Sequence, residues 1–170
     1  MTSESPEEPL DTSQFDAFIQ GLSYPMFVVT AASGQRRGGC LVGFTTQVSI
    51  DPPRFLVCLS VKNHTYEVAT SAQMLAVHVL APHQQQLAEL FGEKTGHETD
   101  KFALCSWRPG PEGVPLLDDC ARLVVGRVLE TSRLGDHVGF VLEPVDATVR
   151  STADPIMFED VADMEPGHEA

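Results

Sequence analysis

The polar residues best suited to bind a ligand or take part in a reaction lie in two short segments, which a pair of prolines separates. The first segment reads GFTTQVS, and its hydroxyl and amide side chains are Thr45, Thr46, Gln47 and Ser49. Together with successive backbone N–H groups, they could cradle a phosphate or the edge of a heteroaromatic ring. Taken alone, the same pattern is also typical of a solvent-exposed strand face, where threonine is common.

The second segment reads SVKNHT and leads into an expected helix. Its polar residues are Ser60, Lys62, Asn63 and Thr65. A helix start attracts anions and Lys62 adds a positive charge, although simple capping by Asn63 or Thr65 explains the pattern equally well. Farther along, Gly135-Asp136-His137 reads as a turn that presents one histidine, which is either functional or merely exposed.

Several familiar catalytic signatures are absent from the sequence. It has neither the glycine fingerprint of a dinucleotide-binding strand–helix unit nor the G-x-S-x-G elbow of serine hydrolases. Its six histidines show no ligand spacing with one another or with cysteine, so no metal site is predicted. The four cysteines are far apart, which favours reduced, buried thiols in a cytoplasmic protein.

Charge and hydropathy narrow the class of protein further. The formal net charge is −13, so neither nucleic acid nor an anionic membrane surface is an expected partner. No apolar run approaches the length of a membrane span, and the acidic start of the chain does not resemble a secretory signal. At 170 residues, one domain with its own core is expected.

The elements that would position these residues are mainly strands. Residues 1–10 read as a disordered acidic lead, residues 11–150 as the domain, and residues 151–170 as an acidic tail. Alternating and β-branched runs predict strands at Tyr24–Ala32, Cys40–Ser49, Arg54–Val61, Met74–Leu80, Cys120–Glu130 and His137–Val149. Helices are expected at Tyr66–Ser71, at His83–Phe91, and after residues 11–13, where Phe15, Phe18, Ile19 and Leu22 share one face.

Short connections between these strands favour an antiparallel barrel with a few appended helices over a doubly wound sheet. A turn is expected at Ser33–Gly39, and Gly92 is expected to end the third helix. Thr95–Leu117 is rich in glycine, proline and charge, so a long irregular loop is predicted there.

In this order, the motifs resemble the flavin reductase-like family of FMN-binding split barrels. GFTTQVSIDPPRFLVCLSVKNHT resembles the family's flavin-wrapping strand, S-x-D-P-P turn and phosphate loop, and GDHVGFVLEPV resembles its G-D-H strand start. MLAVHVLAPHQQQLAELFG resembles a strand and helix ending in phenylalanine. Val42 and Gln47 depart from the pattern, in which asparagine and serine are frequent.

The resemblance implies a mainly β protein with short helices, built as an antiparallel split barrel and dimeric. It implies FMN, or FAD, as the cofactor and NADH or NADPH as the reductant. Thr45, Thr46 and Gln47 would contact the flavin ring, and Ser49 would be a further cofactor-binding residue. The residues near the flavin phosphate would be Ser60, Lys62, Asn63 and Thr65. Phe91 and Phe102 would line the ring or nicotinamide side, and His137 would be the catalytic residue, beside the nicotinamide.

The implied reaction is hydride transfer to the flavin, which requires no general base from the protein. Reduced flavin could then supply a partner monooxygenase. Three other classes stay open: an FMN-binding electron carrier, a related split-barrel oxidase or deazaflavin-dependent reductase, and a dimeric barrel that binds haem or nothing. Whether the flavin is FMN or FAD, and whether it stays bound, is also open at this point.

Overall fold

The computed structural model describes residues 10–167 of the chain, so the expected lead lies outside the described residues except for Leu10. The helices and strands are, in chain order, α1 (Thr12–Ile19), β1 (Phe27–Ser33), β2 (Arg36–Val42), β3 (Thr45–Ser49), β4 (Arg54–Ser60), α2 (His64–Ala69), β5 (Met74–Val79), α3 (Gln85–Glu93), η1 (Lys101–Ala103), β6 (Trp107–Pro109), η2 (Pro111–Gly113), β7 (Pro115–Leu117), β8 (Arg122–Arg133), β9 (His137–Val149) and α4 (Phe158–Val161).

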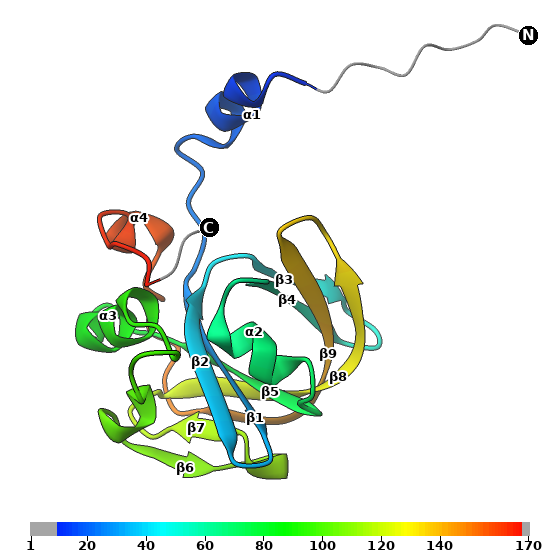
Figure 1. Cartoon of the computed structure of the whole chain (residues 1–170), viewed down its shortest axis with the longest axis vertical. Helices are drawn as coiled ribbons and strands as arrows, with labels where there is room; N and C mark the ends of the chain where they lie inside the picture. The colour runs from blue at the N-terminus through cyan, green and yellow to red at the C-terminus, as the bar shows by residue number, and fades with distance from the viewer. Residues whose placement is uncertain (1–9, 168–170) are drawn as a thin grey trace, which may run out of the picture.

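An antiparallel sheet dominates the fold, as the sequence predicts, but it has seven strands where six are expected (Figure 1). Its strand order is β2-β1-β5-β8-β9-β4-β3, and β6 pairs with β7 in a separate small sheet. Three of its six neighbouring pairs, β2-β1, β8-β9 and β4-β3, are joined by short connections, which is how antiparallel strands are usually linked. None of the helices between residues 10 and 167 has the length and apolar composition needed to cross a bilayer.

Two of the three apolar clusters among the described residues hold the elements around α2 and α3 in place. One packs α2 against the concave face of the large sheet, and it contains Val68 of α2 together with buried strand residues that include Val29, Val57 and Phe140. The other joins the start of β1 to α3 and to the segment after Arg150, and Ile156 of that segment is fully buried in it. Burial of this apolar surface is the main favourable contribution to folding.

The single strand expected from Cys40 to Ser49 is wrong, because the chain breaks at Gly43 and Phe44. On either side, β2 pairs with β1 and β3 pairs with β4, at opposite ends of the strand order. Since only two residues join those ends, the sheet must curl until they approach, and the Cys58 N–H donates to the Phe44 carbonyl over 2.9 Å. The apolar–polar alternation continues through the break and therefore does not reveal it.

Glycines mislead the sequence reading in two further places. The turn expected at Ser33–Gly39 is confined to two residues, of which Gly34 has a φ of +61°, and β2 already begins at Arg36. Within β2, a Cβ on Gly39 would lie 2.6 Å from Phe91 Cε1, so this glycine allows close packing. Gly92 likewise lies inside α3, which extends beyond the expected end to Glu93.

Other local expectations need smaller corrections. The helix expected at Tyr66–Ser71 begins earlier, at His64, because the Asn63 side chain caps it by accepting from the Thr65 N–H over 2.8 Å. The region expected as one irregular loop, Thr95–Leu117, contains β6 and β7. The expected first helix is confirmed as α1, capped by Asp11.

His78 is fully buried in β5, and we expect it to make folding pH-dependent. Its Nε2 accepts from the Leu117 N–H over 3.1 Å, which leaves Nδ1–H to donate to the Val28 carbonyl over 3.0 Å. Burial, which disfavours the charged ring, lowers the pKa of His78 from 6.5 to about 4. The folded state therefore requires the neutral ring.

Because unfolding restores the ordinary pKa, the unfolded chain binds more protons between pH 6.5 and 4, and stability falls as the pH falls through that range. The difference between the two pKa values of His78 corresponds to about 3 kcal/mol. His64, whose pKa burial also lowers, acts in the same direction. Melting temperatures measured at several pH values should decline less steeply below pH 6.5 for His78→Gln than for the unaltered protein or the exposed-site control His83→Gln. Equal slopes would contradict this assignment.

Candidate functional site

A cavity of about 350 Å³ opens where the ends of β2 and β4 meet α3 and the C-terminal segment. Its walls combine apolar and aromatic side chains with a few polar groups, and its size lies in the range of small-molecule sites. Four of the residues singled out from the sequence line it: Ser60, Asn63, Phe91 and His137. They come from three parts of the chain, the segment from Ser60 to Asn63, α3 and the start of β9, that only the fold brings together.

One end of the cavity is polar. Asn63 and Thr95 line it there. Asn63 directly precedes His64, and Thr95 directly precedes Gly96. The two segments are close together, because a Cβ on Gly96 would lie 2.4 Å from His64 Nδ1. Lys94 contributes a positive charge to the same lining. Burial raises the pKa of the neighbouring Cys40 thiol, although hydrogen bonds with Thr65 and Asn63 oppose that rise, so the thiol stays protonated and is a poor nucleophile.

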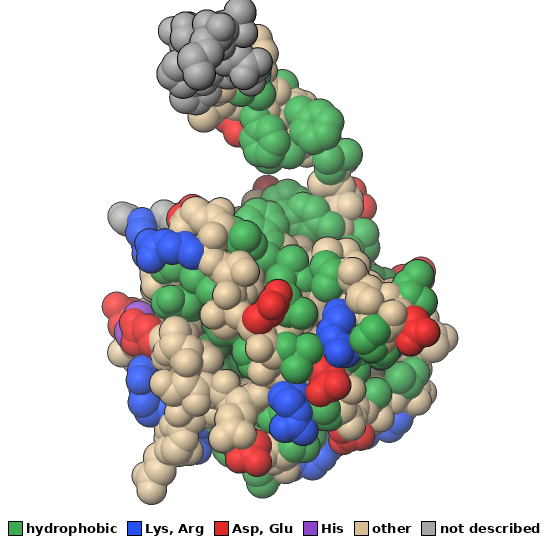
Figure 2. Space-filling model, turned by 90° about the vertical axis from the view of Figure 1, so that its right-hand side faces the viewer, with side chains coloured by type: hydrophobic (Ala, Val, Ile, Leu, Met, Phe, Trp, Pro, Cys, Tyr) green, Lys and Arg blue, Asp and Glu red, His purple; other side chains and the backbone are tan. Residues whose placement is uncertain are grey.

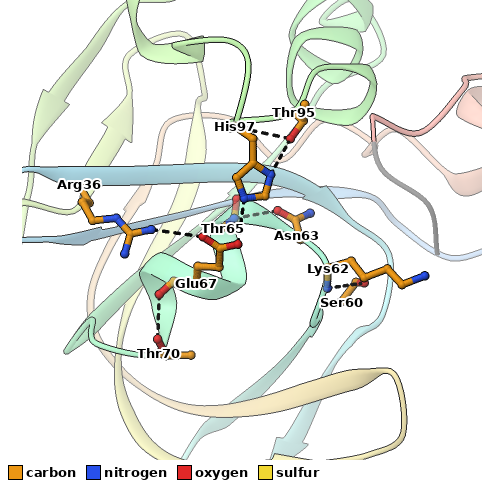
Figure 3. A network of polar contacts seen from close by, with 9 residues as sticks. All are labelled: Arg36, Ser60, Lys62, Asn63, Thr65, Glu67, Thr70, Thr95 and His97. Carbon is orange, nitrogen blue, oxygen red and sulfur yellow. Dashed lines mark hydrogen bonds and ion pairs between the residues drawn. The ribbon is translucent and has the colours of Figure 1, made fainter.

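A polar network fixes the loop that carries Thr95 (Figure 3). His97 Nε2 bonds Glu67 Oε1 of α2 at 2.9 Å, and Arg36 of β2 lies 3.4 Å from the other oxygen of the same carboxylate. The Thr95 hydroxyl is 3.3 Å from His97 Nδ1. The hydrogen bond with His97 is the main cause that lowers the pKa of Glu67. The network ties the loop to α2 and so places Thr95 at the cavity.

The other end of the cavity is aromatic. Phe44 lies between two rings, with centroids 5.1 Å from His137 and 6.2 Å from Tyr24. Tyr24 in turn stacks on Phe158, with centroids 4.9 Å apart and planes 21° apart. All four rings line the cavity, and Phe44 remains 55% exposed. A row of ring faces and edges at a cavity mouth is suited to a planar aromatic ligand.

His137 is oriented by its neighbour in the chain. Its Nδ1–H donates to the Asp136 carboxylate over 2.8 Å, and this hydrogen bond lowers the pKa of Asp136. His137 is the first residue of β9 and pairs with Ser60 in β4, so the polar and aromatic ends meet at this register position. His137, which the sequence predicts to belong to a site, therefore lies between the polar and the aromatic side chains of the cavity.

The remaining predicted site residues lie outside the cavity lining; they are Thr45, Thr46, Gln47, Ser49, Lys62, Thr65 and Phe102. Thr46 and Gln47 are exposed on β3, which is an edge strand of the large sheet. The Thr45 Oγ1 atom is buried and has no hydrogen-bond partner among the residues that the structure describes. An unsatisfied buried hydroxyl is costly, so it marks a place where a ligand group could bind.

Three of these outlying residues occupy other surroundings. Thr65 is buried beneath Gly38, and the exposed Lys62 side chain extends away from the polar network in Figure 3. Phe102 packs edge-on against Phe91, at 5.8 Å between centroids, and lines a second cavity of about 340 Å³. The roles of these residues toward a cofactor stay predictions.

Beside Phe102, the ammonium group of Lys101 is buried and donates to the carbonyls of Gly39 at 2.8 Å and Phe91 at 3.2 Å. Burial lowers its pKa to about 8. These bonds tie the end of α3 to β2, and so support the wall that Phe91 provides to the first cavity.

Sequence reasoning did not select several residues that line the cavity: Tyr24, Phe44, Lys94, Thr95, Phe158 and Met164. Phe44 stands within the GFTTQVS segment, and the Gly-Glu-Lys-Thr run at 92–95 carries a faint phosphate-loop signal. Phe158 and Met164 belong to the acidic tail, whose composition gives no signal of a site.

The curled antiparallel sheet and its ligand-sized cavity define a class of small-molecule-binding β domain. Residues 19–163 match the family model described as flavin reductase like domain, and the chain belongs to that family. It is 36% identical over 128 residues to a "probable flavin reductase" of Rhizobium meliloti, covering 73% of this chain but only 38% of that protein. It is 30% identical to "FMN reductase (NADH) RutF" of Agrobacterium fabrum, covering 77% and 75% of the two chains.

A solved structure of an NADH:FAD oxidoreductase from Streptomyces globisporus has the same architecture. It is 25% identical, with a TM-score of 0.76 over 90% of this chain and 93% of the other. This chain spans well under half the length of the Rhizobium meliloti relative. The similarity therefore does not show that this chain has the whole activity of that protein.

Proposed function

We propose that this protein is an NAD(P)H-dependent flavin reductase whose flavin binds in the cavity between β2, β4 and α3. The observation that carries the proposal is the cavity's division into an aromatic end at Phe44 and a polar end at Asn63 and Thr95. A flavin has the matching division, with a planar ring at one end and a phosphate at the other. Family membership supports the same reaction.

When bound, the flavin supplies the hydride-accepting ring, and the protein's task is to hold that ring against the nicotinamide. Phe44 and Tyr24 offer faces and edges for a ring, while Lys94 adds positive charge for a phosphate. His137, oriented by Asp136, is a positioning group on the nicotinamide side. Reduction by hydride requires no proton donor among these residues.

The working form that we propose is a homodimeric split barrel. The curl of the sheet, forced by the short link between β2 and β3, supports the barrel. The apolar side chains of α1 support the dimer: Phe18 is 72% exposed, and no residue of α1 is buried. Figure 2 shows further hydrophobic side chains on the body below this projecting helix. A helix of eight residues is marginal without packing, so contact with a second copy would stabilise it.

A monooxygenase is the proposed consumer of the reduced flavin, as the family resemblance suggests. Such a partner would receive the flavin by diffusion or by transient contact. Binding that leaves the flavin able to depart is consistent with a cavity whose aromatic end is open to solvent at Phe44.

One experiment tests the proposed reaction. The purified protein is titrated with FMN and FAD, and flavin absorption is followed after NADH or NADPH is added under anaerobic conditions. We expect saturable flavin binding and rapid bleaching with at least one nicotinamide. Light scattering of the same sample should give the mass of a dimer.

Other outcomes point to other classes. Bound flavin that NADH and NADPH reduce only slowly would favour the electron carrier, and the absence of flavin binding would overturn the site as well as the activity. A monomer at micromolar concentration would contradict the dimer while leaving the reaction to be judged by its own measurement.

A further inference from the structure

The segment from Ile156 to Gly167 forms one long wall of the candidate flavin cavity, although its sequence reads as an acidic tail. Five of its residues line the cavity: Phe158, Val161, Ala162, Met164 and Pro166. We call this segment, residues 156–167, the C-terminal strap. It is therefore part of the site, and the reaction proposed above assigns it no role.

Backbone hydrogen bonds hold the strap at both ends. At its start, the Ile156 carbonyl accepts from the Met26 N–H and the Ile156 N–H donates to the Leu80 carbonyl, both at 2.8 Å. At its far end, the Gly167 N–H donates to the Gly92 carbonyl over 3.2 Å. Ile156 is fully buried, so the strap's position is set by the core as well as by these bonds.

The strap runs from the aromatic end of the cavity to its polar end. Phe158 stacks on Tyr24 beside Phe44, and the Phe158 N–H donates to the Tyr24 carbonyl over 2.8 Å. Farther along, Met164 packs on Gly92: a Cβ added to Gly92 would lie 3.0 Å from the Met164 Cε atom. Gly167 packs against the backbone of Glu93 and Lys94, where a Cβ would meet the Glu93 oxygen at 2.7 Å.

The path of the C-terminal strap along the cavity limits the length of the ligand that fits. A mononucleotide whose ring lies at Phe44 would end in a phosphate near Asn63 and Thr95. A dinucleotide would have to continue past that end, where Met164 and Gly167 close one side against α3. Filled space rejects a larger ligand because either the strap or the ligand must move.

We propose that the C-terminal strap makes the site selective for FMN over FAD. This inference rests on the proposed flavin reductase function and adds the choice of flavin to it. The unaltered protein should bind FMN at least about tenfold more tightly than FAD, a typical discrimination for a shape difference in one pocket. Removing the end of the strap should bring the two dissociation constants together, mainly because FAD binds better.

The main test is a truncation after Ala162, which removes Met164 and Gly167 but keeps the buried anchors Ile156 and Val161. Dissociation constants for FMN and FAD are measured by flavin fluorescence, which does not depend on catalysis. Met164→Ala provides a second, milder variant should the truncated chain fail to fold. Glu165→Gln is the matched control, because Glu165 is exposed and does not line the cavity.

We expect the ratio of the FAD to the FMN dissociation constant to fall at least about threefold in the truncation and to fall in Met164→Ala, with Glu165→Gln unchanged. An unchanged ratio in a folded strap variant, or equal affinity for both flavins in the unaltered protein, would overturn the inference while the reductase function survived. If the unaltered protein bound neither flavin, both proposals would fall together.

Discussion

Replacing Gly43 with alanine is expected to weaken flavin binding at least about tenfold while leaving the sheet folded. A Cβ at this position would lie 2.3 Å from Tyr24 Cε2 and 3.0 Å from Met26 Sδ. Met26 is buried, so the Tyr24 ring has to give way, and both Tyr24 and Gly43 line the cavity. The aromatic end of the site would lose its shape before any ligand entered.

A double variant makes this prediction specific. Tyr24→Ala removes the ring that the new Cβ would strike, so Gly43→Ala should have a much smaller additional effect in that background. Flavin titrations of the four proteins in this cycle, with circular dichroism as a check on folding, give the coupling between the two positions. Purely additive losses would mean that the clash at Gly43 does not act through Tyr24.

Replacing Phe91 with alanine is expected to lower the free energy of unfolding by about 3–5 kcal/mol, the usual cost of deleting a buried phenylalanine. Phe91 is only 1% exposed and packs in the cluster that joins α3 to β1 and to the strap. It also lines the cavity, so flavin binding should weaken in the same variant. Urea denaturation and flavin titration measure the two effects separately.

Phe158→Ala is the matched comparison, because Phe158 also lines the cavity but is 38% exposed. Its removal should cost about 1 kcal/mol or less in stability, since less apolar area leaves water on folding. Flavin affinity should nevertheless fall, because the stacking partner of Tyr24 is lost. If Phe91→Ala were as stable as Phe158→Ala, the wall at Phe91 could not be the buried support described above.

Much of the fold follows from local patterns. Alternation and β-branching located the strands of the large sheet, and Asn63 capped α2 as one of the two alternatives expected from its sequence. The predicted element boundaries were wrong where the conformation of a residue depends on packing against a residue far away in the sequence. Gly39 suggested a turn but lies in β2, because Phe91, fifty-two positions later in the chain, packs where its side chain would be.

The residues selected from the sequence divide by whether they line the cavity. Four residues selected from the sequence do line the cavity: Ser60, Asn63, Phe91 and His137. Each lies in a short motif of adjacent residues, so neighbours in the sequence were enough to select it. Thr46 and Gln47 were selected for their hydroxyl and amide groups, but the sequence does not say which way an edge strand faces. The structure leaves them exposed on β3.

The sequence by itself determined that the fold is mainly antiparallel β and which family the chain belongs to, because these depend on patterns between near neighbours. Only the tertiary structure decided that Tyr24, Phe44, His137 and Phe158 form one aromatic row and that the acidic tail closes a cavity wall. Those ring contacts join residues up to 134 positions apart in the chain, and they depend on the curl of the sheet. No local pattern encodes that curl, since it follows from pairing both ends of the strand order at once.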